Sequence, residues 1–156
     1  MAADSAEFRR TCAKFATGIA VLTAVDATGA PLGMTVNSFT SVSLDPPLVL
    51  VCIERQAGIL AALESGGYFG VSVLNETQKH LSVQFARKGD RFDGVAWITG
   101  RTGVPLLRDA IATFEAKIVK KIAAGDHYIV IGEALHLSAA EGRPLIFFDS
   151  RYQTLG

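Results

Sequence analysis

The apolar residues of this chain gather in short runs, and runs of this length are typical of buried β-strands. We expect strands over residues 19–25, 48–53, 68–74, 110–122, 127–137 and 145–148. Turn residues separate the runs, and the Asp-Ala-Thr-Gly segment at 26–29 predicts a hairpin after the first strand. Many short strands with few helices predict a mainly β protein whose antiparallel sheet closes fully or partly into a barrel.

Apolar residues at helical spacing predict a small number of short helices. The first would be capped by Asp4 or Ser5 and would end at Gly18. Its apolar face would comprise Phe8, Cys12, Phe15 and Ile19. A second short helix is expected around residues 59–63, before the two glycines at 66–67.

A third helix is expected to begin at Asn75 and to run through Phe85. Asn75 with Gln78 resembles a capping box, although Asn replaces the usual Ser or Thr. After this helix we expect a charged, glycine-containing loop over 87–94 and an irregular region over 97–107.

A polar stretch at residues 33–47 interrupts the apolar pattern. Thr, Asn and Ser recur in it although apolar runs flank it on both sides, and the prolines at 46–47 end it. Buried polar groups cost free energy unless they find hydrogen-bond partners. The stretch is therefore either a solvated edge strand or the lining of a site for a polar, phosphate-bearing ligand, and composition does not choose between the two.

Length, composition and charge narrow the possible classes of protein. A chain of 156 residues suits one domain, and 49% hydrophobic residues against 19% charged indicates a large core or an apolar surface covered by a partner subunit. Lys plus Arg equals Asp plus Glu, so no overall charge attracts nucleic acid or an anionic membrane. No signal peptide is recognisable, and no apolar run reaches the ~20 residues of a membrane span. We expect a cytoplasmic protein without a nucleic-acid or membrane partner.

Familiar catalytic and metal-binding motifs do not occur in the sequence. Cys12 and Cys52 lie far apart in apolar contexts without a CxxC partner, so reduced, buried thiols are expected and a metal site is not. The sequence contains no GxGxxG, GxxxxGK, HExxH or GxSxG. A redox enzyme of this sequence would therefore not hold its nicotinamide on a Rossmann module.

Four stretches in order resemble the flavin reductase-like family, the FMN-binding split barrels that serve as small reductase components of two-component flavin-dependent monooxygenases. The stretches are 15–23 (FATGIAVLT), 33–47, 125–128 (GDHY) and 144–152, which contains PLIFF and Arg151-Tyr152. The resemblance extends over nearly the whole chain. It implies an antiparallel Greek-key split β-barrel, with residues 1–156 as one domain.

The resemblance also implies a binding site for FMN or FAD. The residues that it assigns to the flavin are Met34, Thr35, Val36, Asn37, Ser38, Ser41, Cys52, Ile53, Glu54, Arg55, Phe85, Arg91 and Tyr152. A strand with small side chains can present backbone N–H and C=O groups to the pyrimidine edge of the isoalloxazine, and backbone N–H groups stabilise the negative charge of the reduced ring. The end of the strand at 52–55 is expected to hold the ribityl phosphate, but Gln56-Ala57-Gly58 stands where many relatives have Lys and Ser or Thr.

Several of these residues also have a structural interpretation. Arg55 is either a phosphate ligand or a solvated strand end, and Arg91 either a phosphate ligand or a surface charge. Phe85 either covers the flavin or packs in the core of its helix. Tyr152 either closes over the site or packs at a dimer interface.

His127 lies in Gly-Asp-His, which resembles the nicotinamide-binding motif of the family. We expect its imidazole to hold the carboxamide or the ring of NADH or NADPH near the flavin, without acting as an acid or base. His80 and His136 are expected to be structural.

The sequence thus predicts a homodimeric NAD(P)H:flavin oxidoreductase that supplies reduced flavin to a partner monooxygenase. One alternative is a flavin-binding store or sensor without turnover, against which the Gly-Asp-His motif argues. Another is a barrel that binds a ligand other than flavin.

Overall fold

The computed structural model describes residues 1–64, 67–89 and 91–156. Gly66, one of the two glycines expected to end the second helix, and Asp90 of the charged loop lie outside the described residues. The elements are α1 (Ser5–Cys12), β1 (Thr17–Gly18), β2 (Ala20–Val25), β3 (Pro31–Val36), β4 (Thr40–Leu44), β5 (Pro47–Glu54), the 3₁₀-helix η1 (Gly58–Ala62), β6 (Tyr68–Val73), α2 (Lys79–Phe85), β7 (Trp97–Thr99), β8 (Pro105–Leu107), β9 (Ala112–Ala124), β10 (His127–Ala139), β11 (Ile146–Phe148) and β12 (Arg151–Gln153).

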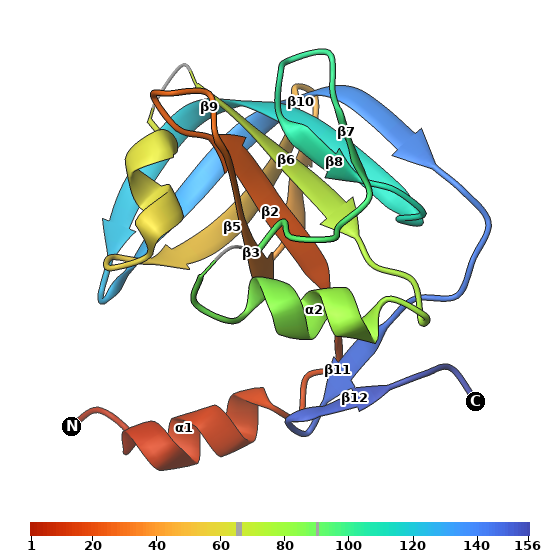
Figure 1. The fold of residues 1–156 in the computed structure, drawn as a ribbon. Coiled ribbons are helices and arrows are strands. Elements are labelled where there is room, and N and C mark those ends of the chain that lie inside the picture. Colours follow the sequence, from red (N-terminus) through yellow and green to blue (C-terminus); the bar gives the residue numbers. More distant parts are fainter. Residues whose placement is uncertain (65–66, 90) are drawn as a thin grey trace.

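The main sheet has seven strands in the order β3-β2-β6-β9-β10-β5-β4, and all its strand pairs are antiparallel. It curls into a barrel with α2 across one end and β11–β12 beyond α2 (Figure 1). The two edge strands, β3 and β4, follow one another in the chain, so residues 37–39 connect the two edges of the sheet. This is the expected mainly β, antiparallel Greek-key split barrel.

Two hydrophobic clusters lie on opposite faces of β2. Leu22 and its even-numbered neighbours point into the barrel core with residues from β3, β5, β6, β9, β10 and η1. Val21 points the other way, into a second cluster formed with α2, β8 and Leu145. Burial on both faces explains why the sequence of this strand is continuously apolar rather than alternating.

The expected capping box before α2 forms in modified geometry. The Gln78 side chain accepts a hydrogen bond from the N–H of Asn75 at 3.0 Å, as its counterpart in a capping box does. The Asn75 side chain, however, accepts from the N–H of Thr77 at 2.7 Å, two residues on, because it closes a local turn. The helix therefore begins at Lys79 rather than at Asn75.

The first helix is shorter than the apolar spacing predicts. It is capped by Asp4, as expected, but it ends at Cys12, and it buries none of its residues. Phe15 lies outside the helix and is 79% exposed. Cys12 is exposed as well, contrary to the expectation of a buried thiol. α1 extends away from the barrel (Figure 1). No other part of the described chain packs against its apolar residues, so a longer helix would gain no buried contact.

A short hairpin and a strand near the C-terminus were not predicted. The region expected to be irregular contains the hairpin β7–β8, and β12 pairs with β11 after a turn at Asp149 and Ser150. Both turn residues have positive φ, as a two-residue hairpin of this kind requires. β8 explains two buried polar residues of the barrel, because Pro105 accepts from the Thr23 hydroxyl and Leu107 donates to Ser72.

Candidate functional site

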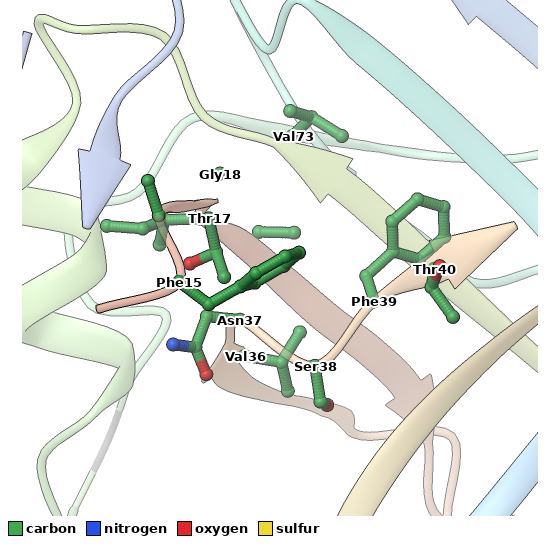
Figure 2. Close-up of a pocket in the computed structure, with 12 residues that line it drawn as sticks. Phe15, Thr17, Gly18, Val36, Asn37, Ser38, Phe39, Thr40 and Val73 are labelled. Atoms are coloured by element: carbon green, nitrogen blue, oxygen red, sulfur yellow. The ribbon is translucent and has the colours of Figure 1, made fainter. Parts of the chain in front are cut away.

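Two hollows lie along the edge strand β3 and its continuation. The first, called here the Thr17 hollow, has a volume of about 340 Å³ and is lined by residues 15–20 and 36–40 with Val73 (Figure 2). The second, called here the Arg91 hollow, has a volume of about 380 Å³ and is lined by residues 31–34, 57–59, 88–89 and 91–92. Consecutive segments of the chain, 31–34 and 36–40, thus line the two hollows.

An unpaired hydroxyl lies in the Thr17 hollow. The Oγ1 atom of Thr17 is buried, and within the described residues it is the one buried side-chain nitrogen or oxygen atom without a hydrogen-bond partner. Such atoms are rare in folded proteins and call for an explanation, of which a ligand is one. The exposed ring of Phe15 lies beside Thr17, and Asn37 and Ser38 lie below it in the same view (Figure 2).

The outer edge of β3 carries backbone groups that point away from β2. The carbonyl oxygen of Gly33 accepts a hydrogen bond from Nη1 of Arg91 at 2.8 Å, so it points away from β2. In an antiparallel strand the N–H and C=O of one residue point to the same side, and the side alternates along the chain. The N–H and C=O of Thr35 therefore also point to the open edge. The Thr35 hydroxyl is already used, since it donates to the Ser82 carbonyl at 2.6 Å.

Lys88 and Arg91 give the Arg91 hollow a positive rim. Arg91 is fixed in place because its guanidinium donates both to the Arg87 carbonyl and to the Gly33 carbonyl. A side chain at position 33 would collide with Phe85, whose ring atoms would lie 2.7 Å from an added Cβ. Glycine at this position is therefore what allows α2 and the Arg91 loop to approach the strand.

Arg55 and the turn before β10 form a third group of candidate residues. The backbone N–H of Arg55 donates to the Asp126 carbonyl at 3.0 Å, and its Nε donates to the Gly125 carbonyl at 2.8 Å. The guanidinium also lies over the ring of Tyr128, 4.8 Å from its centroid. Arg55 thus contacts the turn that carries His127 and is not among the described residues that line the Arg91 hollow.

His127 and Asp126 interact directly at the turn. The Nδ1 atom of His127 lies 2.6 Å from the carboxylate of Asp126, and this hydrogen bond lowers the pKa of the Asp126 carboxyl below its ordinary value. An ionised carboxylate only accepts, so Nδ1 carries the proton and Nε2 of a neutral imidazole is left as an acceptor. β5 lies between β10 and Ser38, so two strand spacings, roughly 10 Å, separate Ser38 from Ile129, which lies two residues along β10 from His127.

The structure places the remaining predicted site residues in several environments. Val36, Asn37 and Ser38 line the Thr17 hollow, and Met34 lines the Arg91 hollow. Ser41 and Glu54 are exposed, the first on β4 and the second at the end of β5.

Two of the predicted flavin contacts lie in the hydrophobic core. Ile53 and Phe85 are fully buried, so neither offers surface to a ligand in this structure, and Phe85 takes the core position that was its alternative interpretation. Cys52 bonds through its backbone to Ser38, and burial raises the pKa of its thiol. The hydroxyl of Tyr152 lies 2.8 Å from that of Ser82, so Tyr152 ties β12 to α2.

The sequence-based list missed Thr17, Phe15 and Lys88, which line the hollows. The stretch at 15–23 carried part of the family resemblance, so a signal for Thr17 was present, but the unpaired state of its hydroxyl is visible only in the structure. Within the described residues, no group of three or more His, Cys, Asp or Glu side chains is placed to hold a metal ion. The described helices also include none with the length and apolar character needed to cross a membrane.

The chain belongs to the flavin reductase family. Residues 12–156 match the model described as "Flavin reductase like domain". The chain is 43% identical over 152 residues to the NADH-dependent flavin reductase StyB of Pseudomonas fluorescens, covering 96% of this chain and 89% of that one. It is 49% identical over 130 residues to a probable flavin reductase of Rhizobium meliloti, covering 83% of this chain but only 42% of the relative, so it spans less than half of that protein.

A solved structure shows the same fold. The NADH:FAD oxidoreductase SgcE6 of Streptomyces globisporus, in complex with NAD and FAD fragments, superposes with a TM-score of 0.93 at 36% identity, covering 98% of this chain and 93% of that chain. The split-barrel fold expected from the resemblance is therefore confirmed.

Proposed function

We propose that this chain is an NAD(P)H:flavin oxidoreductase that supplies reduced flavin to a flavin-dependent monooxygenase. The observation that carries the proposal is the pair of hollows along the open edge of β3, one with an unpaired buried hydroxyl and the other with a positive rim. Relatives named NADH-dependent flavin reductase and reductase subunit of a monooxygenase support the activity and the partner. Residues 1–156 form one such domain in this proposal.

The residues of the two hollows suit FMN or FAD. The backbone of Thr35 to Ser38 would hold the polar edge of the isoalloxazine, and Lys88 with Arg91 would hold phosphate. The unpaired Thr17 hydroxyl would join the first group when flavin binding shifts the residues that bury it. The flavin, when bound, supplies the hydride acceptor. The contribution of the chain is to orient the two nucleotides, to exclude water with Phe15 and Phe39, and to offer donors where negative charge increases.

His127 would hold the nicotinamide. With the proton on Nδ1 committed to Asp126, the Nε2 atom can accept a hydrogen bond from a carboxamide N–H. NADH is favoured over NADPH because the relatives that name a donor name NADH. The imidazole positions the donor and transfers no proton in this proposal.

The active form is proposed to be a cytoplasmic homodimer. Support for the dimer comes from large apolar side chains that the single chain leaves exposed, among them Leu44 at 96% and Leu137 at 63%. An eight-residue helix such as α1 is not stable in water alone, and it buries none of its residues here. Light scattering of the purified protein tests this part of the proposal directly.

The experiment that tests the activity combines flavin titration with steady-state oxidation of NADH. We expect FMN or FAD to bind and NADH to be consumed in proportion to added flavin. Binding without NADH consumption would favour a flavin store or sensor in the same barrel. Absence of binding would contradict both and would leave a barrel for another ligand.

A further inference from the structure

We propose that Arg55 is a positioning residue for the turn that carries His127, and that it is not a ligand of the flavin phosphate. This inference rests on the proposed function, since it concerns how the nicotinamide is held. It also assigns to Arg55 a role that differs from both sequence-based interpretations, the phosphate ligand and the solvated strand end.

The contacts of Arg55 all go to one turn. Its backbone N–H and its Nε donate to two successive carbonyls, those of Asp126 at 3.0 Å and Gly125 at 2.8 Å. Its Nη1 lies 3.3 Å from the Tyr128 hydroxyl, and its guanidinium covers the Tyr128 ring. Three of the four residues from 125 to 128 are thus held by this one residue, and His127 is the remaining one.

The turn needs such support. Gly125 has φ +59°, in the left-handed region, and the Asp126 side chain is 95% exposed, so packing does not fix the turn. Asp126 is nevertheless the residue that orients the imidazole through Nδ1. Arg55 holds the carbonyls of the two peptide groups that flank Asp126. It thereby fixes the direction from which the Asp126 carboxylate reaches His127.

A phosphate role fits the geometry less well. The Nε and Nη1 atoms of Arg55 are directed to the turn and to Tyr128, and Arg55 is not among the described residues that line the Arg91 hollow. After β3, the next described residue that lines the Arg91 hollow is Ala57. The positive charge of this hollow comes from Lys88 and Arg91. We therefore assign phosphate recognition to Lys88 and Arg91.

The chain offers a matched control for the charge and the aromatic contact. Lys121 also lies 4.8 Å from the centroid of Tyr128, and its Nζ pairs with Glu64 at 3.0 Å. It makes a cation–π contact with the same ring as Arg55 does. No hydrogen bond to residues 125–127 is found for Lys121 in the described structure, so replacing it perturbs the ring and the local charge without releasing the turn.

The test compares Arg55→Lys, Arg55→Met and Lys121→Met with the wild-type protein. We expect both Arg55 variants to raise the KM for NADH about tenfold, the loss of one to two hydrogen bonds, while kcat changes less than twofold. The dissociation constants of FMN and riboflavin, measured by fluorescence, should stay within twofold. Nitrogen NMR of the ring should show His127 shifting from the Nδ1–H form to a mixture of tautomers. Lys121→Met should leave all of these unchanged.

Three outcomes would overturn the inference. Weaker binding of FMN but not of riboflavin in Arg55→Met identifies a phosphate ligand. A wild-type KM in Arg55→Lys shows that charge alone suffices. An unchanged His127 tautomer in both variants shows that Arg55 does not orient the ring. The NMR measurement requires no turnover, so it decides the positioning role even if the wild-type protein reduces no flavin, and Arg55→Lys decides it if Arg55→Met fails to fold.

Discussion

The Ser38 hydroxyl and the Cys52 backbone are joined by two hydrogen bonds. The N–H of Cys52 donates to Oγ of Ser38 at 2.9 Å, and the same hydroxyl donates to the Cys52 carbonyl at 3.1 Å. Ser38 belongs to the segment that connects the edge strands β3 and β4. Its side chain therefore pairs with the N–H and C=O of Cys52 on β5, which a neighbouring strand would otherwise pair with. The polar side chain thereby closes the barrel next to the Thr17 hollow.

Ser38→Ala is expected to destabilise the protein by about 1–3 kcal/mol, because it leaves the backbone N–H and C=O of Cys52 without this partner. Urea denaturation monitored by Trp97 fluorescence measures the change. Ser41→Ala is the control, because Ser41 is exposed, and it should lie within about 0.5 kcal/mol of wild type. Equal stability of the two variants would contradict the role of Ser38.

Thr17→Val is expected to change stability and flavin binding in opposite directions. Removing an unpaired buried hydroxyl at constant shape should stabilise the free protein by about 1 kcal/mol. The same change should raise the flavin dissociation constant about tenfold, since the ligand loses a partner. Thermal unfolding without flavin and a fluorescence titration provide the two readouts, and Thr17→Ser should retain wild-type affinity. Unchanged affinity in Thr17→Val would remove Thr17 from the site.

His127→Ala is expected to raise the KM for NADH and to leave the flavin dissociation constant nearly unchanged. The reason is that His127 lies on the hairpin beyond β5, and neither hollow is lined by it in the described structure. His80→Ala, an exposed position on α2, is the control and should behave as wild type. A rise in the flavin dissociation constant alone would assign His127 to the flavin instead.

Glu115 gives the protein a predictable dependence of stability on pH. Burial raises the pKa of its carboxyl, but hydrogen bonds from Thr102 and Arg101 outweigh this effect and bring the pKa below the ordinary value of 4.5. A carboxyl whose pKa is lowered by folding stabilises the protein above its unfolded pKa, and that contribution is lost as the pH falls through the folded pKa.

Glu115→Gln should therefore destabilise the protein by about 1–2 kcal/mol at pH 7, and the difference from wild type should shrink below pH 4.5. Denaturation curves between pH 3 and pH 7 test this prediction, and exposed Glu141→Gln serves as the control. A difference that does not depend on pH would mean that the charge of Glu115 contributes nothing.

The sequence predicts the barrel well because its strands differ in pattern from their connections. β2 and β5 appear as apolar runs since both lie within the sheet, and the turn at 26–29 joins β2 to β3 as expected. β7, β8 and β12 were missed because three residues are too few for a period. The first helix was predicted too long because Phe15 lies at helical spacing from the apolar residues before it. In the structure Phe15 is exposed and lies outside the helix.

The candidate site is predicted less completely, for two physical reasons. Apolar residues within a motif, such as Phe85 and Ile53, look alike in sequence whether they face a ligand or the core, and here they face the core. Thr17 pairs with Phe147 of β11, and Arg55 contacts the turn at 125–128, so the surroundings of both residues depend on segments far away in the chain. No local pattern encodes such pairings.

Anaerobic stopped-flow mixing of the protein and flavin with NADH tests the central claim most directly. The account predicts rapid loss of the visible flavin absorbance with FMN or FAD, in step with oxidation of one NADH per flavin, and a higher NADH requirement for His127→Ala. Flavin that binds but keeps its absorbance after mixing with NADH and with NADPH would contradict the claim that this protein is a reductase.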